Sequence, residues 1–231
     1  MKKRTQSPCP NSRETVSGFC YLAFQMLLLP SVLYWINDQL PASLSESELN
    51  FLFYFVNFLS VLVIFHDFLA NSLGQLLHHP IEALQAAILG LVAYYVCFHT
   101  IDWLVSLLVP GYTNYNDESI AALSRGNYFL TLIGTVILVP ITEECFYRGV
   151  IFRNLYKKSP WAAYCISIAA FACIHILGYI GQYSAKELVI AVLQYLPAGL
   201  WLAWSYLKGH TIFVPIAIHS AVNFITIRSI L

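Results

Sequence analysis

Polar side chains that could activate water gather in the second half of this chain, within stretches that are otherwise apolar. Ionisable groups are costly in hydrocarbon, so they usually face a protein interior or a water-filled cavity and serve function there. Two carboxylates, a guanidinium, two imidazoles and an amide together predict a hydrolytic site inside a membrane. They form three motifs: Glu143-Glu144-x-x-x-Arg148, Phe171-x-x-x-His175 and His219-x-x-x-Asn223.

The adjacent carboxylates of the first motif are expected to have different roles. Successive helix residues point roughly 100° apart, so Glu143 and Glu144 cannot both face one point. Glu144 and Arg148 lie four residues apart on one helix face, which predicts a supporting ion pair that leaves no lone charge in the membrane. Glu143 is then free to act as a general base on water. The alternative is that all three residues only join helices.

The two histidine motifs suit complementary tasks. His175 follows Phe171 by four residues, so the aromatic ring is expected to wall a pocket in which the imidazole orients or polarises water. His219 and Asn223 are one helical turn apart, and both can donate hydrogen bonds to the oxyanion that forms as a carbonyl becomes tetrahedral. The alternatives are a packing histidine and a His–Asn hydrogen bond between helices.

Residues near the motifs carry secondary expectations. Pro140 precedes Glu143 by three residues and Pro215 precedes His219 by four. Because proline frees carbonyls and bends helices, both prolines are expected to open a water-accessible pocket beside their motif. His99 and Asp102, three residues apart in another apolar stretch, are expected to be a structural pair.

Absent patterns narrow the chemistry further. The sequence has no His-Glu-x-x-His zinc motif, no Gly-x-Ser-x-Gly nucleophile elbow and no metal or redox spacing among its six cysteines. Glutamate-activated water is the chemistry that remains, and no cofactor is expected. One alternative stays open, because carboxylate and imidazole are ordinary zinc ligands. Its ligands would be Glu143, His175 and His219.

The composition places these motifs in a membrane protein. Of 231 residues, 58% are apolar and 10% are charged, whereas soluble domains carry roughly 25% charged residues. The mean hydropathy is +0.66. A net charge of zero argues against a nucleic-acid partner. Internal repeats and linkers are absent from the sequence, so we expect one all-α domain, residues 1–231, that encloses a polar cavity.

Seven stretches approach the roughly 20 apolar residues that a membrane-spanning helix needs. The first follows a basic segment and is expected to be retained rather than cleaved, because the small residues of a signal cleavage site do not follow it. N-terminal helices over about 19–109 are expected to accompany a core of about 127–230 that holds the motifs. The predicted spans are 19–37, 49–66, 83–109, 127–156, 160–181, 186–207 and 211–230.

Lysine and arginine positions predict the orientation through the positive-inside rule. Seven crossings with a cytoplasmic N-terminus leave eight basic residues inside and three outside, and put the C-terminus outside. The 67–82 segment has neither lysine nor arginine and is the weak point of this topology. The inside set is Lys2, Lys3, Arg4, Arg13, Arg153, Lys157, Lys158 and Lys208, and the outside set is Arg125, Lys186 and Arg228.

The motifs are also expected to meet at one depth. Counted at about 1.5 Å per residue from the turns at the basic end, Glu143, His175 and His219 lie roughly 21, 24 and 16 Å along their helices. Helix tilt can remove differences of this size. The three motifs therefore share a level near, or somewhat beyond, the bilayer midplane.

In these motifs the chain resembles the CAAX protease and bacteriocin-processing family (CPBP or Abi) of glutamate-dependent intramembrane proteases. All three family motifs occur in order over about 127–230, on separate predicted spans. The resemblance implies a helical membrane fold with a cavity open to the cytoplasmic leaflet. It also implies that Glu143 and His175 activate water and that His219 and Asn223 form the oxyanion hole, with Glu144 and Arg148 in support.

The resemblance implies a membrane-associated protein or peptide as substrate. Eukaryotic relatives cleave prenylated proteins that end in the CAAX pattern, whereas many bacterial relatives are linked to peptide maturation, bacteriocin immunity or membrane signalling. The short chain resembles the bacterial type, which implies a bacterial plasma membrane. The non-enzymatic alternative is an immunity or scaffold protein that keeps the polar motifs for folding.

Overall fold

Long apolar stretches of this chain form helices, because in lipid each backbone N–H and C=O must be bonded within its own segment. The computed structural model describes residues 7–230, and the regular elements there are all helical. Within these described residues, six helices are long and apolar enough to cross a membrane. Five of them are α3 (Glu46–Ile64), α5 (Pro80–Leu108), α10 (Pro160–Leu177), α11 (Ala185–Gly209) and α12 (Phe213–Ile230).

The sixth long helix runs over Tyr128–Tyr156 and carries the glutamate motif. It is α-helical except for two π-helical segments, which lie on either side of the two glutamates. Its parts are α7 (Tyr128–Ile133), η1 (Gly134–Leu138), α8 (Val139–Glu144), η2 (Cys145–Phe152) and α9 (Arg153–Tyr156).

The first predicted span, 19–37, is a bent pair rather than one straight helix. The chain forms α1 (Ser12–Leu27) and α2 (Leu29–Asp38), which meet at an angle of 48°. Pro30 is the second residue of α2. Proline has no N–H and clashes with the carbonyl of the preceding turn, which accounts for the break. The number of possible crossings is therefore six, or seven if the bent pair is one span.

Two shorter helices fill the connections. The uncertain 67–82 segment is α4 (His66–His78), and α5 begins directly after it at Pro80. The sequence did not predict α6 (Tyr115–Gly126), which begins after the cap residue Asn114 and has two acidic residues in its first turn. An acidic first turn favours a helix start because the helix dipole is positive there.

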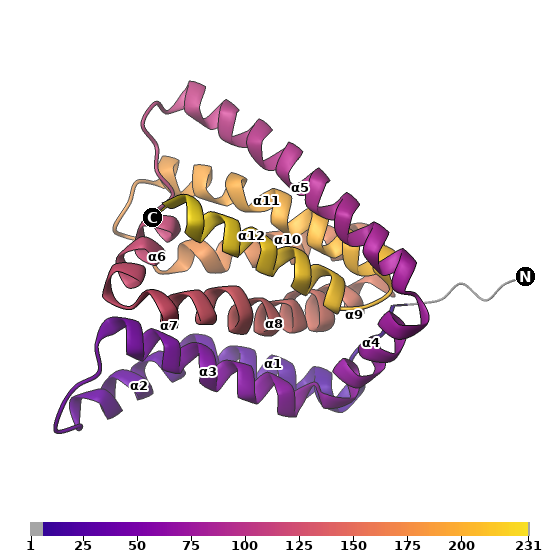
Figure 1. The fold of residues 1–231 in the computed structure, drawn as a ribbon, viewed down its shortest axis with the longest axis horizontal. Helices are drawn as coiled ribbons and strands as arrows, with labels where there is room; N and C mark the ends of the chain where they lie inside the picture. Colours follow the sequence, from indigo (N-terminus) through magenta and orange to yellow (C-terminus); the bar gives the residue numbers. More distant parts are fainter. Residues whose placement is uncertain (1–6, 231) are drawn as a thin grey trace, which may run out of the picture.

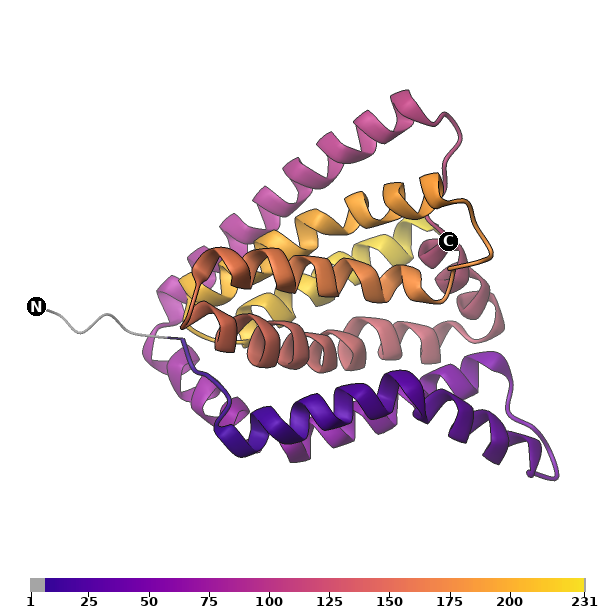
Figure 2. The ribbon, with the colours of Figure 1, turned by 180° about the vertical axis from the view of Figure 1, so that it is seen from behind.

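The helices form a bundle with two distinct ends (Figure 1). The start of α1, α4, the α9–α10 turn and the α11–α12 turn lie at what we call the N-terminal end. The α2–α3 connection, α6, the α10–α11 loop and the end of α12 lie at the opposite end, which we call the α6 end. Figure 2 shows α10 packed across the back of the bundle, against α11 and the Tyr128–Tyr156 helix. The second half of α5 leans away from its neighbours.

The N-terminal end is closed by residues 7–14 and a large apolar cluster. Arg153 is buried and donates from Nε to the Ser7 carbonyl oxygen at 2.9 Å. The buried Glu14 carboxylate accepts the Phe68 N–H at 2.8 Å, in the first turn of α4, and the Asn11 N–H at 2.8 Å. Both oxygens of this carboxylate are therefore used to hold helix starts together.

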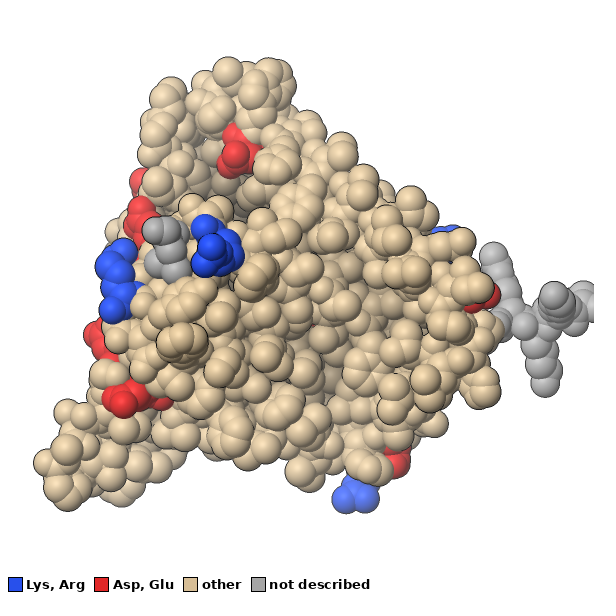
Figure 3. Space-filling model, viewed as in Figure 1, with Lys and Arg blue, Asp and Glu red and all other residues tan. Residues whose placement is uncertain are grey.

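The outer surface fits a membrane environment. Figure 3 shows Lys, Arg, Asp and Glu mainly towards the two ends, with a broad uncharged band between them. Large apolar side chains are well exposed there, for example Val63 at 80% and Val96 at 64%. A water-soluble surface rarely has so extended an apolar area. The predicted class, an all-α polytopic membrane protein, is confirmed, and the chain is an integral membrane protein.

Candidate active site

A cavity of about 930 Å³ brings the three motifs together. Glu143, His175, His219 and Asn223 all line it, with Phe171 as part of the wall. Its lining extends from the middle of the bundle to the α6 end, where it includes residues of α2, α6 and the last turn of α10. Residues 7–14, α4 and the α9–α10 turn contribute nothing to the lining.

Pro140 supports the site through a carbonyl that it leaves free. In the adjoining π-helical segment, the Val139 N–H bonds to the Gly134 oxygen, five residues back. The same pattern would pair the Thr135 oxygen with residue 140, but proline has no N–H. Asn223 instead donates to this oxygen from Nδ2 at 2.8 Å. Pro140 thus frees a carbonyl beside the motif, but Asn223 rather than water is bonded to it, and the expected opening of a pocket by Pro140 stays a prediction.

The matching expectation for Pro215 is wrong. Helix α12 begins at Phe213, so Pro215 lies in its first turn. The first four N–H groups of a helix have no partner within that helix. A proline there removes no hydrogen bond and produces no bend beside His219.

The predicted ion pair between Glu144 and Arg148 is present. Arg148 Nη1 donates to Glu144 Oε1 at 2.8 Å, and both side chains are fully buried. Arg148 also donates from Nη2 to the Ala198 carbonyl oxygen at 3.0 Å. Its guanidinium carbon lies 4.3 Å from the centre of the Phe171 ring, which adds a cation–π contact. Phe171 therefore supports the ion pair as well as walling the cavity.

His219 joins this ion pair, which the sequence did not predict. Its Nδ1 lies 2.9 Å from Glu144 Oε1. A carboxylate accepts hydrogen bonds, so Nδ1 carries the proton and donates it. The other ring nitrogen, Nε2, lies 4.0 Å from Glu143 Oε2. Spacing within one helix gives no information on such a contact between α8 and α12.

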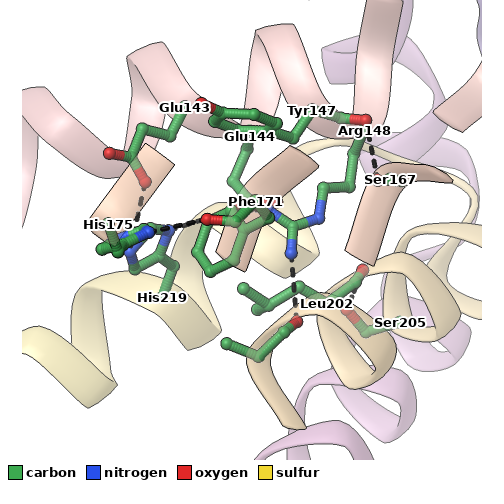
Figure 4. A network of polar contacts seen from close by, with 11 residues as sticks. Glu143, Glu144, Tyr147, Arg148, Ser167, Phe171, His175, Leu202, Ser205 and His219 are labelled. Carbon is green, nitrogen blue, oxygen red and sulfur yellow. Dashed lines mark hydrogen bonds and ion pairs between the residues drawn. The ribbon is translucent and has the colours of Figure 1, made fainter. Parts of the chain in front are cut away.

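Glu143 is the carboxylate that faces the cavity. Its side chain is 23% exposed, whereas that of Glu144 is 0% exposed. Figure 4 shows Glu143 extending towards the two imidazoles while Glu144 points towards Arg148. Within residues 7–230, the buried Oε2 of Glu143 has no hydrogen-bond partner. Glu144 thus pairs with Arg148 and Glu143 faces the cavity, as predicted, but both carboxylates also lie within 4.0 Å of the His219 ring, which the argument from helix faces did not allow.

His175 is held in a defined tautomer beside the cavity. Its Nδ1 lies 2.7 Å from the Phe171 carbonyl oxygen, which can only accept, so Nδ1 is the donor. In the neutral ring, Nε2 is then left with its lone pair. One face of the ring stacks on Tyr195 of α11, with centroids 4.1 Å apart. Sequence reasoning missed Tyr195, because nothing in its local pattern separates it from other span aromatics.

Residues 125–225 match the family model for the type II CAAX prenyl endopeptidase, Rce1-like. This part of the chain is Rce1-like. All three motifs lie inside the matched range, so the resemblance found from the motifs is confirmed. Comparisons with curated proteins and with solved structures found no match.

The zinc alternative concerns three residues of this segment. Among the residues that the structure describes, no group of three or more His, Cys, Asp or Glu side chains is arranged to hold a metal ion. The cavity is lined by Glu143, His175 and His219, which do not form a ligand cluster. The Nδ1 atom of His219 is hydrogen-bonded to Glu144. The zinc reading remains a prediction that chelation can test.

The expected pair of His99 and Asp102 does not form. Asp102 accepts a hydrogen bond from Gln194 of α11 at 3.3 Å, and the His99 ring stacks on Tyr95 with centroids 5.7 Å apart. Asp102 thereby joins the lining of the cavity, outside the Rce1-like segment.

The α6 end of the cavity carries one perturbed acid. Asp117, in the first turn of α6, lines the cavity, and burial raises its pKa to about 6 from an ordinary value of 3.8. Desolvation penalises the charged form of an acid. A partly buried carboxyl thus lies between the active-site residues and the outside of the bundle.

Proposed function

We propose that this protein is an intramembrane endopeptidase that hydrolyses a peptide bond of a membrane-associated protein or peptide. One observation carries the proposal: Glu143 has a free carboxylate oxygen in a cavity that also receives His175 and His219. The match of residues 125–225 to the Rce1-like family model supports a protease. Glu143 differs from the supporting Glu144 in its access to the cavity, since its side chain is 23% exposed and that of Glu144 is 0% exposed.

Glu143 is the proposed general base. It removes a proton from water, and the resulting hydroxide attacks the carbonyl carbon of the scissile bond. The tetrahedral intermediate collapses as the C–N bond breaks, and the proton passes from Glu143 to the leaving amine. His175 assists by accepting a hydrogen bond from the water at Nε2, since its Nδ1 proton is held by Phe171.

His219 and Asn223 are the proposed oxyanion donors. Because Nδ1 of His219 donates to Glu144, a second donor at Nε2 requires the imidazolium form. Asn223 uses one N–H on Thr135 and keeps the second for substrate.

The side of the membrane at which cleavage occurs is a second part of the proposal. The basic residues Arg13, Arg153, Lys157, Lys158 and Lys208 lie on elements of the N-terminal end, and Lys2, Lys3 and Arg4 lie outside the described residues. The positive-inside rule therefore places the N-terminal end in the cytoplasm and the C-terminus outside. The cavity would then open outward, whereas the family resemblance predicts a cytoplasmic opening. The two expectations conflict.

Cysteine labelling decides between these two orientations. Asn116→Cys, at the cavity mouth on α6, and Ser159→Cys, at the N-terminal end, would be made in the full chain with its six native cysteines replaced. A membrane-impermeant maleimide added to intact cells should label residue 116 and not residue 159. The reverse labelling pattern would show that the cavity opens to the cytoplasm and would refute the proposed orientation.

The substrate is proposed only by class, as a membrane-anchored protein or peptide, with a prenylated CAAX-type protein as one member and a bacterial membrane peptide as another. Protein termini compared by mass spectrometry in cells carrying wild type or Glu143→Gln, at equal expression, test the activity and find the substrate. Termini specific to wild type are expected. Identical termini, where the gene matters to the cell, would favour the non-catalytic immunity or scaffold protein.

A further inference from the structure

An aromatic ring from a neighbouring helix covers one face of His175. The Tyr195 ring of α11 lies 4.1 Å from the imidazole, centroid to centroid, with an angle of 25° between the planes. The Phe171 ring, 4.8 Å away, is tilted by 51° against the imidazole. Of these two contacts, the Tyr195 stack is the closer and more nearly parallel. None of the three motifs contains Tyr195.

The ring of Tyr195 is itself held by a chain of hydrogen bonds across three segments. Its hydroxyl donates to Asn114 Oδ1 at 3.3 Å, and Asn114 Nδ2 donates to Gln194 Oε1 at 2.9 Å. Gln194, which is 7% exposed, donates onward to Asp102 Oδ1 at 3.3 Å. The chain thus connects α5, the start of α6 and α11. It ends at a ring in contact with a proposed catalytic residue.

We propose that Tyr195 is a positioning residue for His175, and that the Asn114–Gln194–Asp102 chain fixes Tyr195 in place. The proposal rests on the proposed function of His175. The Nδ1 hydrogen bond to Phe171 sets the tautomer of the imidazole but leaves its plane free to tilt about that bond. A parallel aromatic face at 4.1 Å removes that freedom and fixes the direction of Nε2 towards the cavity.

The expected effect is on the chemical step rather than on substrate binding. A catalytic group misplaced by about 1 Å can cost roughly 100-fold in rate. Removing the stack while keeping His175 should lower kcat by about tenfold to 100-fold. KM should stay within about twofold of wild type. Loss of only the Tyr195 hydroxyl should cost about threefold or less, because the ring face remains.

The test uses the purified full-length protein in detergent and a peptide that spans the cleavage site found by the termini comparison. The variants are Tyr195→Leu, which removes the aromatic face, and Tyr195→Phe, which keeps it. Tyr195→Met fills the same space without an aromatic ring and replaces the leucine variant if that variant does not fold. Asn114→Ala tests the supporting chain. Tyr164→Leu, at the other end of α10 against Phe152, is the control for loss of a span tyrosine.

We expect kcat to fall at least tenfold in Tyr195→Leu and Tyr195→Met, and to change little in Tyr164→Leu. Tyr195→Phe and Asn114→Ala both remove the hydrogen bond between Tyr195 and Asn114, so each should lower kcat by about threefold or less. The proposal is overturned if kcat stays within twofold without the ring, if KM rises instead, or if phenylalanine loses as much as leucine. An unchanged kcat in both Tyr195→Phe and Asn114→Ala would refute the role of the chain. Failure of the proposed function itself looks different, because wild-type protein would then show no Glu143-dependent cleavage.

Discussion

The buried charged groups of the N-terminal end and the buried polar groups around the cavity are bonded in different ways. At the N-terminal end, Glu14 has partners for both carboxylate oxygens, and Arg153 donates to backbone carbonyls of residues 7 and 8. Around the cavity, the structure leaves the hydroxyl of Thr142 and one oxygen each of Glu143 and Glu144 without partners. In this second group, Thr142 and Glu144 are as buried as Glu14, at 6%, 0% and 5% exposed.

This difference distinguishes buried side chains that stabilise the fold from buried side chains near the proposed catalytic groups. Buried polar groups are normally hydrogen-bonded, and an unpaired one carries a free-energy cost. At the N-terminal end the charged groups Glu14 and Arg153 avoid that cost through bonds to backbone groups, although Ser72, Gln75 and His210 each leave one buried atom unpaired. Around the cavity the cost remains, which is expected where water or substrate supplies the missing partners. Variants at the two ends should therefore change different observables.

The largest expected effect comes from Glu143→Gln. Loss of the general base should reduce cleavage by roughly 10²–10⁴-fold, while the thermal midpoint in detergent stays close to that of wild type, because the side chain makes no essential contact. Peptide cleavage and thermal unfolding of one preparation measure both. If Glu143→Gln unfolds, Glu143 has a structural role instead of the proposed catalytic one.

Glu144→Gln should act mainly on stability. It leaves Arg148 buried without its counter-ion, and breaking a buried pair costs about 3–5 kcal/mol. We expect a low yield of folded protein and a lowered thermal midpoint, with some loss of activity through His219. A stable but inactive Glu144→Gln, paired with an unstable Glu143→Gln, would mean that the roles of the two carboxylates are reversed.

Glu14→Gln tests the N-terminal end. It removes the charge from two hydrogen bonds to backbone N–H groups, and hydrogen bonds to charged groups are worth about 1.5–3 kcal/mol each. The thermal midpoint should fall while kcat and KM of the remaining folded protein stay unchanged. A change in KM would show that residues 7–14 communicate with the cavity.

The smallest effect is expected at Asp117, through pH. Its pKa of about 6 in the folded state exceeds the ordinary 3.8, so the unfolded chain releases this proton first. The contribution of Asp117 to the free energy of unfolding therefore falls as pH rises from about 4 to 6, and it stays lower at higher pH. Asp117→Asn should raise the thermal midpoint by roughly 2–4 °C at pH 7.5 and leave it unchanged at pH 4. Equal shifts at both pH values would refute the ionisation argument.

Much of the site could be predicted because its signals are local. The spacing of Glu144 and Arg148 determines which side chains share a helix face, and the ion pair follows from it. Hydropathy locates the long helices in the same way. The convergence of the three motifs was predicted from the helix rise and the positions of the basic turns, and one cavity does receive all three.

The remaining features depend on contacts between helices. The hydrogen bond from His219 to Glu144 and the stack of Tyr195 on His175 each join two helices, and no spacing rule relates residues 75 or 20 positions apart. The break at Leu28 and the π-helical segments arise where proline or tertiary packing overrides the regular α-helical pattern. Pro215 was misjudged because the start of its helix was placed two residues too early.

The π-helical segments on either side of the glutamates determine how deletions or insertions of residues would affect this helix. A π-helical turn holds one residue more than an α-helical turn, as if one residue had been inserted into an α-helix. Deleting one residue from Cys145–Phe152 would therefore regularise the helix and leave the side chains after it near their present facing. Deleting one residue from the α-helical part Val139–Glu144 would instead rotate everything after it by roughly 100°. A change in length is therefore expected to be tolerated in the π-helical segments and not in α8.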